Sequence, residues 1–193
     1  HVLGTELYLG ELQGVIGRPK KLCFTQFPES AFVTTYSATN GVTDSAASGT
    51  ALSTGHKTYN AAIGVGRDTV EVYSVAADLA DKGMAIGVAT TVPINHATPS
   101  AFYAHNMSRH NYDEIAPWML EAGYDFYAGG DVKGYDETRK NVYDKAKEQG
   151  YAIARGYNDY LAKAEGAEKI MLYQKDVATE LPYAINRTEK DLT

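Results

Sequence analysis

The chain has 193 residues, a hydrophobic fraction of 44% and a formal net charge of −6 at pH 7. This length suffices for one sizeable hydrophobic core, and the acidic balance argues against nucleic acid or an anionic membrane surface as the main partner. No apolar run approaches the length of a membrane span, and the single cysteine, Cys23, excludes an intrachain disulfide. We expect Cys23 to be a small buried hydrophobic residue.

The first half of the chain predicts helices and strands in alternation. Leucines at positions 7, 9 and 12 indicate an opening helix, and residues 31–36 predict a strand that leads toward Ser45. Apolar residues at helical spacing follow over 72–79, and Gly83 ends that helix. Residues 84–90 form a short apolar run, which predicts a strand buried on both faces.

The second half repeats this alternation. The expected helices span residues 115–122, 137–149 and 158–165, and the expected strands span 124–128, 151–154 and 170–173. Strands separated by helices need crossover connections, so the predicted fold class is α/β, a mostly parallel sheet flanked by helices. We expect residues 1–193 to form a single domain, in which the polar residues 176–193 are a long connection.

The segment from Gly41 to Ala51 reads GVTDSAASGTA and places the hydroxyl of Ser45 beside the carboxylate of Asp44. A helix that begins at Ser45 would point its first N–H groups and the positive end of its dipole at an anion. A serine hydroxyl is a weak nucleophile at neutral pH, so a base or a metal ion must remove its proton. The alternative interpretation is an ordinary N-cap pair at the start of a helix.

This segment, extended through Ser53-Thr54-Gly55 and residues 57–60, closely resembles the nucleophile segment of the alkaline phosphatases of bacterial type. The resemblance implies that Ser45 becomes phosphorylated. It also implies the three-layer α/β sandwich of that family. No Gly-x-Ser-x-Gly elbow surrounds Ser45, which counts against an esterase.

A second segment runs from Thr91 to Ser100 and continues as a predicted helix to Arg109. Thr98 followed by Pro99 fits an N-cap and the first helical residue. The segment resembles a second alkaline phosphatase motif, in which a metal-side Asp or His precedes a Thr and, one helix later, an Arg. His96, Thr98 and Arg109 occupy those positions.

The resemblance implies a role for each of these residues. Arg109 would clamp two phosphate oxygens with parallel N–H groups, and Asp44 would orient Arg109 or stiffen the turn at Ser45. Thr98 and His96 would bind magnesium, for which zinc could compete. Ser45 would be both the nucleophile and a metal ligand.

The zinc ligands that the family carries are absent from the sequence: an N-terminal aspartate, an Asp-x-x-x-His pair, an adjacent Asp-His pair and a late histidine. Residues 111–193 contain no histidine, and no Asp-His dipeptide occurs. We therefore expect the chain to be the central portion of a larger protein, without phosphatase activity by itself.

The implied function is a zinc- and magnesium-dependent phosphomonoesterase that acts through a phosphoserine at Ser45, on phosphate monoesters, with inorganic phosphate as a ligand. Two alternatives stay open: a phosphate-binding fragment without turnover, and a relative of the phosphodiesterases or sulfatases. The resemblance further implies a homodimer in the complete protein and a periplasmic or otherwise extracytoplasmic location in a bacterium.

Overall fold

The computed structural model describes residues 21–29 and 31–174, so the expected opening helix and the polar segment 176–193 lie outside the described part. The chain divides into two compact units, His1–Thr34 and Thr35–Thr193. The described part of the first unit holds a short 3-10 helix, η1 (Cys23–Gln26), none of whose residues is buried. Cys23 is exposed, so the expectation of a buried cysteine is wrong.

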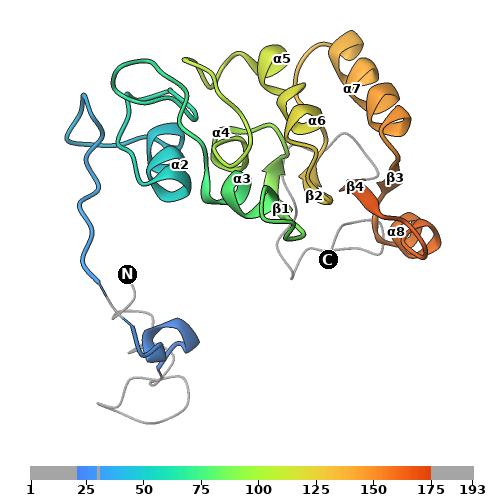
Figure 1. Ribbon diagram of the computed structural model, residues 1–193, viewed down its shortest axis with the longest axis horizontal. Coiled ribbons are helices and arrows are strands. Elements are labelled where there is room, and N and C mark those ends of the chain that lie inside the picture. The colour runs from blue at the N-terminus through green and yellow to red at the C-terminus, as the bar shows by residue number, and fades with distance from the viewer. Residues whose placement is uncertain (1–20, 30, 175–193) are drawn as a thin grey trace, which may run out of the picture. The chain divides into compact units, whose positions relative to one another are not determined.

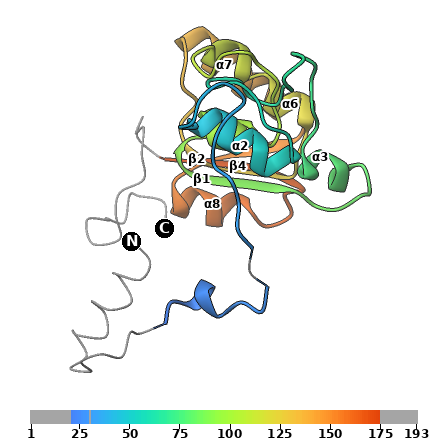
Figure 2. The same cartoon turned by 90° about the vertical axis from the view of Figure 1, so that its left-hand side faces the viewer.

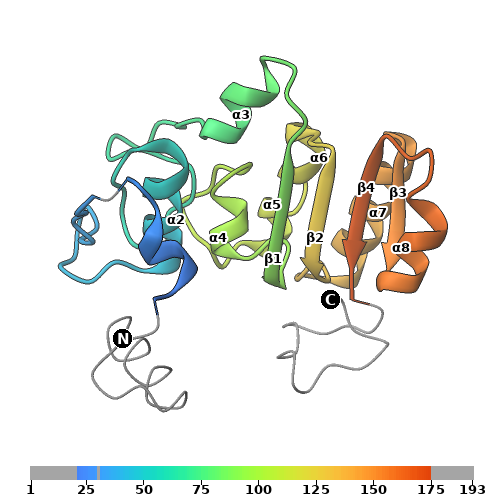
Figure 3. The same cartoon turned by 90° about the horizontal axis from the view of Figure 1, so that it is seen from below.

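The second unit is built on four parallel strands, which confirms the predicted fold class. The strands are β1 (Gly87–Pro93), β2 (Phe126–Gly130), β3 (Tyr151–Arg155) and β4 (Lys169–Tyr173). They are hydrogen-bonded in the order β1-β2-β4-β3, and Figure 3 shows them side by side in that order. Because all four are parallel, their carboxyl ends meet at one edge of the sheet.

The helices of this unit are α2 (Ser45–Thr54), α3 (Val75–Ala80), α4 (Ala97–Ser100), α5 (Tyr112–Ile115), α6 (Trp118–Ala122), α7 (Asp136–Glu148) and α8 (Tyr157–Lys163), and Figure 1 traces them in chain order. Seen along the sheet in Figure 2, α2, α6 and α7 lie on one side and α8 on the other. No helix in the described ranges is long and apolar enough to cross a membrane.

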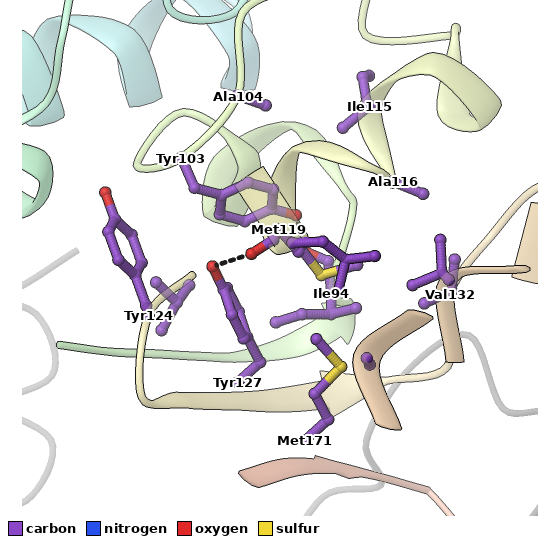
Figure 4. Packing of buried hydrophobic residues seen from close by; sticks show 14 of the residues in the cluster. Ile94, Tyr103, Ala104, Ile115, Ala116, Met119, Tyr124, Tyr127, Val132 and Met171 are labelled. Carbon is purple, nitrogen blue, oxygen red and sulfur yellow. Dashed lines mark hydrogen bonds between the residues drawn. The ribbon is translucent and has the colours of Figure 1, made fainter. Parts of the chain in front are cut away.

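The main core lies between the sheet and the helices of the α2, α6 and α7 side. Val88, Tyr127 and Met171 are neighbours on three adjacent strands and all are buried. Tyr127 donates a hydrogen bond to the carbonyl oxygen of Met119 on α6 at 2.9 Å, and packs edge-on against Tyr103 (Figure 4). The buried residues Tyr103, Tyr127 and Tyr151 fill much of this layer, and each hydroxyl donates to a backbone carbonyl oxygen.

Two sequence-based strand predictions need correction. Residues 31–36 form no strand, and Phe32 and Val33 are exposed, because no strand in the described ranges pairs with them. The strand expected at 84–90 is β1, which runs from Gly87 to Pro93. It alternates exposed and covered residues instead of being buried on both faces, since it lies at the edge of the described sheet.

The helix expected at 115–122 is divided into α5 and α6. The division falls at Pro117, which has no N–H to continue the helical hydrogen bonds. The helices α7 and α8 and the strands β2, β3 and β4 match their predictions to within two residues at every end. Their apolar periodicity was therefore a sufficient signal.

Candidate functional site

Ser45 is the first residue of α2, as the sequence predicted, and its side chain is exposed. Asp44 is the N-cap, and its Oδ1 accepts a hydrogen bond from the N–H of Ala47 at 2.9 Å. That bond satisfies one of the free N–H groups of the first turn and leaves those of Ser45 and Ala46 without an acceptor within the helix. The start of this ten-residue helix therefore suits an anion beside the Ser45 hydroxyl.

The second carboxylate oxygen of Asp44 joins two further parts of the chain. Oδ2 accepts hydrogen bonds from the N–H of Ala61 at 3.0 Å and from Nη1 of Arg109 at 3.3 Å. Burial by itself would raise the pKa of the carboxyl, but the hydrogen bonds from Ala47, Ala61 and Arg109 outweigh burial and hold the pKa below its ordinary value. Asp44 is therefore a carboxylate at neutral pH and is poorly suited to act as a base.

Arg109 lies in a loop and not at the end of a helix, so that prediction is wrong: α4 ends at Ser100. The backbone N–H of Arg109 donates to the carbonyl oxygen of Ala61 at 2.8 Å. Its guanidinium spans Asp44, through Nη1, and His96, whose Nε2 lies 3.3 Å from Nη2. Two side chains, those of Asp44 and His96, and the backbone of Ala61 thus fix the arginine beside the start of α2.

Ala61 is a residue that the sequence analysis missed. Its φ of 71° lies in the left-handed region, which is uncommon for alanine. Both of its backbone groups are used, the N–H by Asp44 and the carbonyl oxygen by Arg109. A strained residue that connects two candidate site residues is typical of functional sites, and no glycine or proline marks it in the sequence.

His96 is the N-cap of α4, which begins at Ala97, so the prediction of Thr98 as N-cap is wrong. Pro99 is the third helical residue. The N–H at this position has no acceptor within a helix, so the missing N–H of proline costs no hydrogen bond. Burial, and then the charges of Arg109 and Lys133, lower the pKa of His96. The imidazole is therefore neutral at pH 7 and can accept a hydrogen bond or bind a metal ion.

Thr98 is exposed on α4, and Gly49 of α2 packs against the same short helix. A Cβ at Gly49 would lie 3.1 Å from Cβ of Ala101 and 3.4 Å from Cα of Thr98. The small residue therefore allows α2 and α4 to approach closely. This contact connects the helix that begins with Ser45 to the helix that carries Thr98.

Asn95 and Lys133 are two more residues that the sequence analysis missed. Asn95 is fully buried, and its Nδ2 donates to the carbonyl oxygens of Tyr112 and Lys133 at 3.2 and 2.7 Å. Its Oδ1 accepts from the N–H of Lys133 at 2.8 Å. Asn95 therefore fixes the loop after β1 to the loop after β2. The signal for both residues was their place just beyond strands that end at the same edge of the sheet.

The described residues hold no complete set of metal ligands. Over 21–29 and 31–174, no group of three or more His, Cys, Asp or Glu side chains could hold a metal ion. Zinc usually takes three or four protein ligands, so these ranges do not form a zinc site. Magnesium takes oxygen ligands and keeps several waters. The Thr98 hydroxyl fits such a shell, and the neutral His96 could contribute one further ligand.

A comparison with protein families matches the part of the chain that carries the candidate site residues. A family model described as alkaline phosphatase matches residues 2–132. Alkaline phosphatase 4 of Bacillus subtilis is 41% identical over 117 residues, which are 58% of this chain and 25% of that protein. Alkaline phosphatase 3 of Bacillus subtilis is 35% identical over 163 residues, 79% of this chain and 34% of that protein.

Solved structures show the same likeness. The alkaline phosphatase of the Antarctic bacterium TAB5 is 37% identical, with a TM-score of 0.73, over 82% of this chain and 47% of that one. The Thermus thermophilus alkaline phosphatase is 26% identical, with a TM-score of 0.75, over 94% of this chain and 38% of that one. Two variants of the TAB5 enzyme, in which a histidine is replaced by Asp or Glu, have Mg bound in a site termed M3. The chain therefore spans between a quarter and a half of the length of these relatives.

Proposed function

The chain belongs to the alkaline phosphatase family, and on that premise we propose that it carries the nucleophile and the phosphate-binding groups of a metal-dependent phosphomonoesterase. One observation carries the proposal. An exposed serine begins α2, while Asp44 and His96 hold the guanidinium of Arg109 from two sides. This arrangement offers positive charge and N–H donors to a phosphoryl group next to a hydroxyl.

Arg109 would bind the non-bridging oxygens of the phosphoryl group. Its contacts with Asp44 and His96 use one N–H of each terminal nitrogen, and a guanidinium has five N–H donors in a planar fork. The remaining donors can contact two oxygens in parallel. The unbonded N–H groups at the start of α2 would contact the same anion. Together they would offset the charge of an in-line transition state.

Ser45 would attack the phosphorus atom as the bond from phosphorus to the ester oxygen breaks, so that a phosphoserine forms and the alcohol leaves with the serine proton. The Asp44 carboxylate does not take the serine proton in this proposal, because three donors engage it and its pKa is low. Magnesium beside Thr98 and His96 would supply positive charge near the phosphoryl group when bound. We infer that zinc, if required, takes its ligands from segments that the relatives have and this chain does not span.

The 193-residue chain by itself should then bind phosphate and hydrolyse phosphate monoesters at the background rate. Arg109 and the helix terminus bind phosphate, but without metal ions to lower its proton affinity the Ser45 hydroxyl stays a weak nucleophile. From family membership alone we also propose that the whole protein acts on phosphate monoesters, is a homodimer and works outside the cytoplasm of a bacterium.

Replacement of Ser45 in the whole protein tests the proposal. Ser45→Ala should abolish hydrolysis of p-nitrophenyl phosphate and the phosphoserine seen by mass spectrometry. Ser48→Ala, one turn further along the same helix, is the matched control and should retain both. Activity that survives Ser45→Ala would refute Ser45 as the nucleophile. Zinc-dependent turnover by the 193-residue chain would contradict its predicted inactivity.

A further inference from the structure

A cavity of about 290 Å³ lies between α3, the segment that follows α4, and α6. None of the residues placed at the Ser45 site lines this cavity. Its wall is largely aromatic and is formed by Tyr73, Phe102, His105, Trp118 and Tyr124. Sites for small molecules are concave, begin at about this volume, and combine an apolar or aromatic lining with a few polar groups. The cavity therefore has the size and the lining of a site for a small organic molecule.

Hydrogen bonds within the protein hold the walls of this cavity in place. The carbonyl oxygen of Phe102 accepts from the hydroxyl of Ser74 at 2.6 Å and from the hydroxyl of Tyr124 at 2.9 Å. Nδ1 of His105 lies 2.6 Å from the carbonyl oxygen of Gly64, and Nδ1 is the donor because a carbonyl can only accept. Gly64 has a φ of 58°, and a Cβ there would lie 2.9 Å from Nδ1 of His105. The shape of the cavity is therefore fixed by the fold itself.

Three of the aromatic rings pack edge to face and keep accessible surface. The ring of His105 lies 5.0 Å, between centroids, from the ring of Tyr73 and 5.0 Å from the ring of Trp118. Tyr73 is exposed, and His105 and Trp118 are partly exposed, so all three have surface that a ligand can contact. Aromatic rings that surround a site attract cations, above all those whose charge is spread over alkyl groups.

The charged side chains of the lining point to the same kind of ligand. No lysine or arginine lines the cavity, whereas two exposed carboxylates, those of Asp81 and Glu121, do. Neither carboxylate forms an ion pair with a residue of the ranges 21–29 and 31–174. Asp81 is the C-cap of α3, and Glu121 is the residue before the last of α6. Free carbonyl oxygens at helix ends make a negative charge unfavourable there. The cavity therefore carries an unbalanced negative charge, which a cationic ligand would offset.

We propose that this cavity binds a small organic cation of the quaternary ammonium class. The carboxylates of Asp81 and Glu121 supply the opposite charge from two helix ends, and the aromatic wall contacts the alkyl groups around the nitrogen. A bare metal ion fits less well, because no group of three His, Cys, Asp or Glu side chains in the described ranges could hold one. The ligand is opposite in charge to the phosphate proposed for the Ser45 site, so the two sites can be measured separately.

A titration of the purified chain with choline chloride, followed by the fluorescence of Trp118, tests the proposal. Trp118 is the only tryptophan and lines the cavity, so its emission reports whether the cavity is occupied. We expect a saturable change in emission that sodium chloride at the same concentration does not produce. The uncharged analogue 3,3-dimethylbutanol has the same shape as choline without its charge. It should bind about fivefold more weakly or worse, as loss of one unit charge at a partly exposed site implies.

Replacement of the two carboxylates identifies the cavity as the place of binding. Glu121→Gln and Asp81→Asn should each weaken choline binding about fivefold or more, and both should fold because both side chains are exposed. Asp78→Asn changes an exposed carboxylate of α3 outside the lining, so it is the matched control and should bind choline normally. Three results would overturn the proposal: no saturable change in the parent, equal affinity for choline and 3,3-dimethylbutanol, or equal choline affinity in Asp78→Asn and either of the other two variants.

Discussion

Replacement of Asp44 by alanine should destabilise the fold far more than loss of an ordinary surface carboxylate. The side chain caps α2 through Ala47 and accepts hydrogen bonds from Ala61 and Arg109. Loss of an N-cap costs about 1 kcal/mol, and each hydrogen bond to a charged group contributes about 1.5–3 kcal/mol. The side chains of Asp44 and Arg109 are 25% and 17% exposed, so solvent screening reduces the ion-pair part. We expect the free energy of unfolding to fall by about 2–4 kcal/mol.

Urea denaturation, followed by the fluorescence of the single tryptophan, Trp118, measures this loss. Asp136→Ala is the matched control, because Asp136 is 98% exposed and pairs with Arg139 at the surface. Its loss should cost less than about 1 kcal/mol, as expected for an exposed first-turn carboxylate of α7. Asp44→Asn should retain the cap and lose less than Asp44→Ala. Equal stabilities of the Asp44→Ala and Asp136→Ala variants would refute the role assigned to Asp44.

The pKa of Asp44 adds a pH dependence to the same experiment. Because the folded protein holds this pKa below the ordinary 3.8, Asp44 stabilises the fold fully above pH 3.8 and progressively less as pH falls through its folded pKa. The stability difference between the parent and Asp44→Asn should therefore be constant near neutral pH and shrink at lower pH. A difference that grows on acidification would contradict the sign of the shift.

Three further predictions address single positions. Ala61→Gly should raise the free energy of unfolding by about 0.5–1 kcal/mol, because glycine adopts a φ of 71° without strain; lower stability in urea denaturation would show that the strain is absent. His96→Asp should bind magnesium more tightly in a titration of the protein, since a carboxylate suits magnesium better than an imidazole, and identical curves would place His96 outside the metal shell. Gly129→Ala should destabilise β2, because a Cβ there would lie 2.7 Å from Cγ2 of Thr90 and 2.9 Å from the carbonyl oxygen of Val92; unchanged thermal unfolding would show that the backbone can relax.

The sequence predicted the elements that carry strong apolar periodicity and missed those that depend on tertiary partners. The helix α7 and the strand β4 were found from their patterns alone. The β-branched run at 31–36 has the composition of a strand, but a strand needs a hydrogen-bonding partner, which composition does not reveal. Burial of Cys23 failed for a similar reason, because its short helix packs no residue into a core.

The residues of the candidate site likewise divide into those that sequence patterns predicted and those that depend on tertiary contacts. Ser45, Asp44, His96, Thr98 and Arg109 were selected from two segments whose residue types and spacing matched a known pattern. The structure pairs Asp44 with Arg109, 65 positions further along the chain, as the resemblance implied, whereas the contact of Asp44 with Ala61 could only be learned from the fold. Ala61 acts through backbone geometry that leaves no recognisable trace in a single sequence. Asn95 acts through buried amide bonds, and its only sequence signal was its place just beyond a strand.

The amide NMR spectrum of the purified chain during a titration with inorganic phosphate tests the central claim most directly. If Arg109 and the start of α2 form the phosphate cradle, the N–H signals of Ser45 and Ala46 should shift with saturation. The shift should be lost in Arg109→Ala and reduced in Arg109→Lys, since lysine lacks the bidentate fork. Signals of Ser45 and Ala46 that stay fixed in the parent, or that shift equally in Arg109→Ala, would contradict the account.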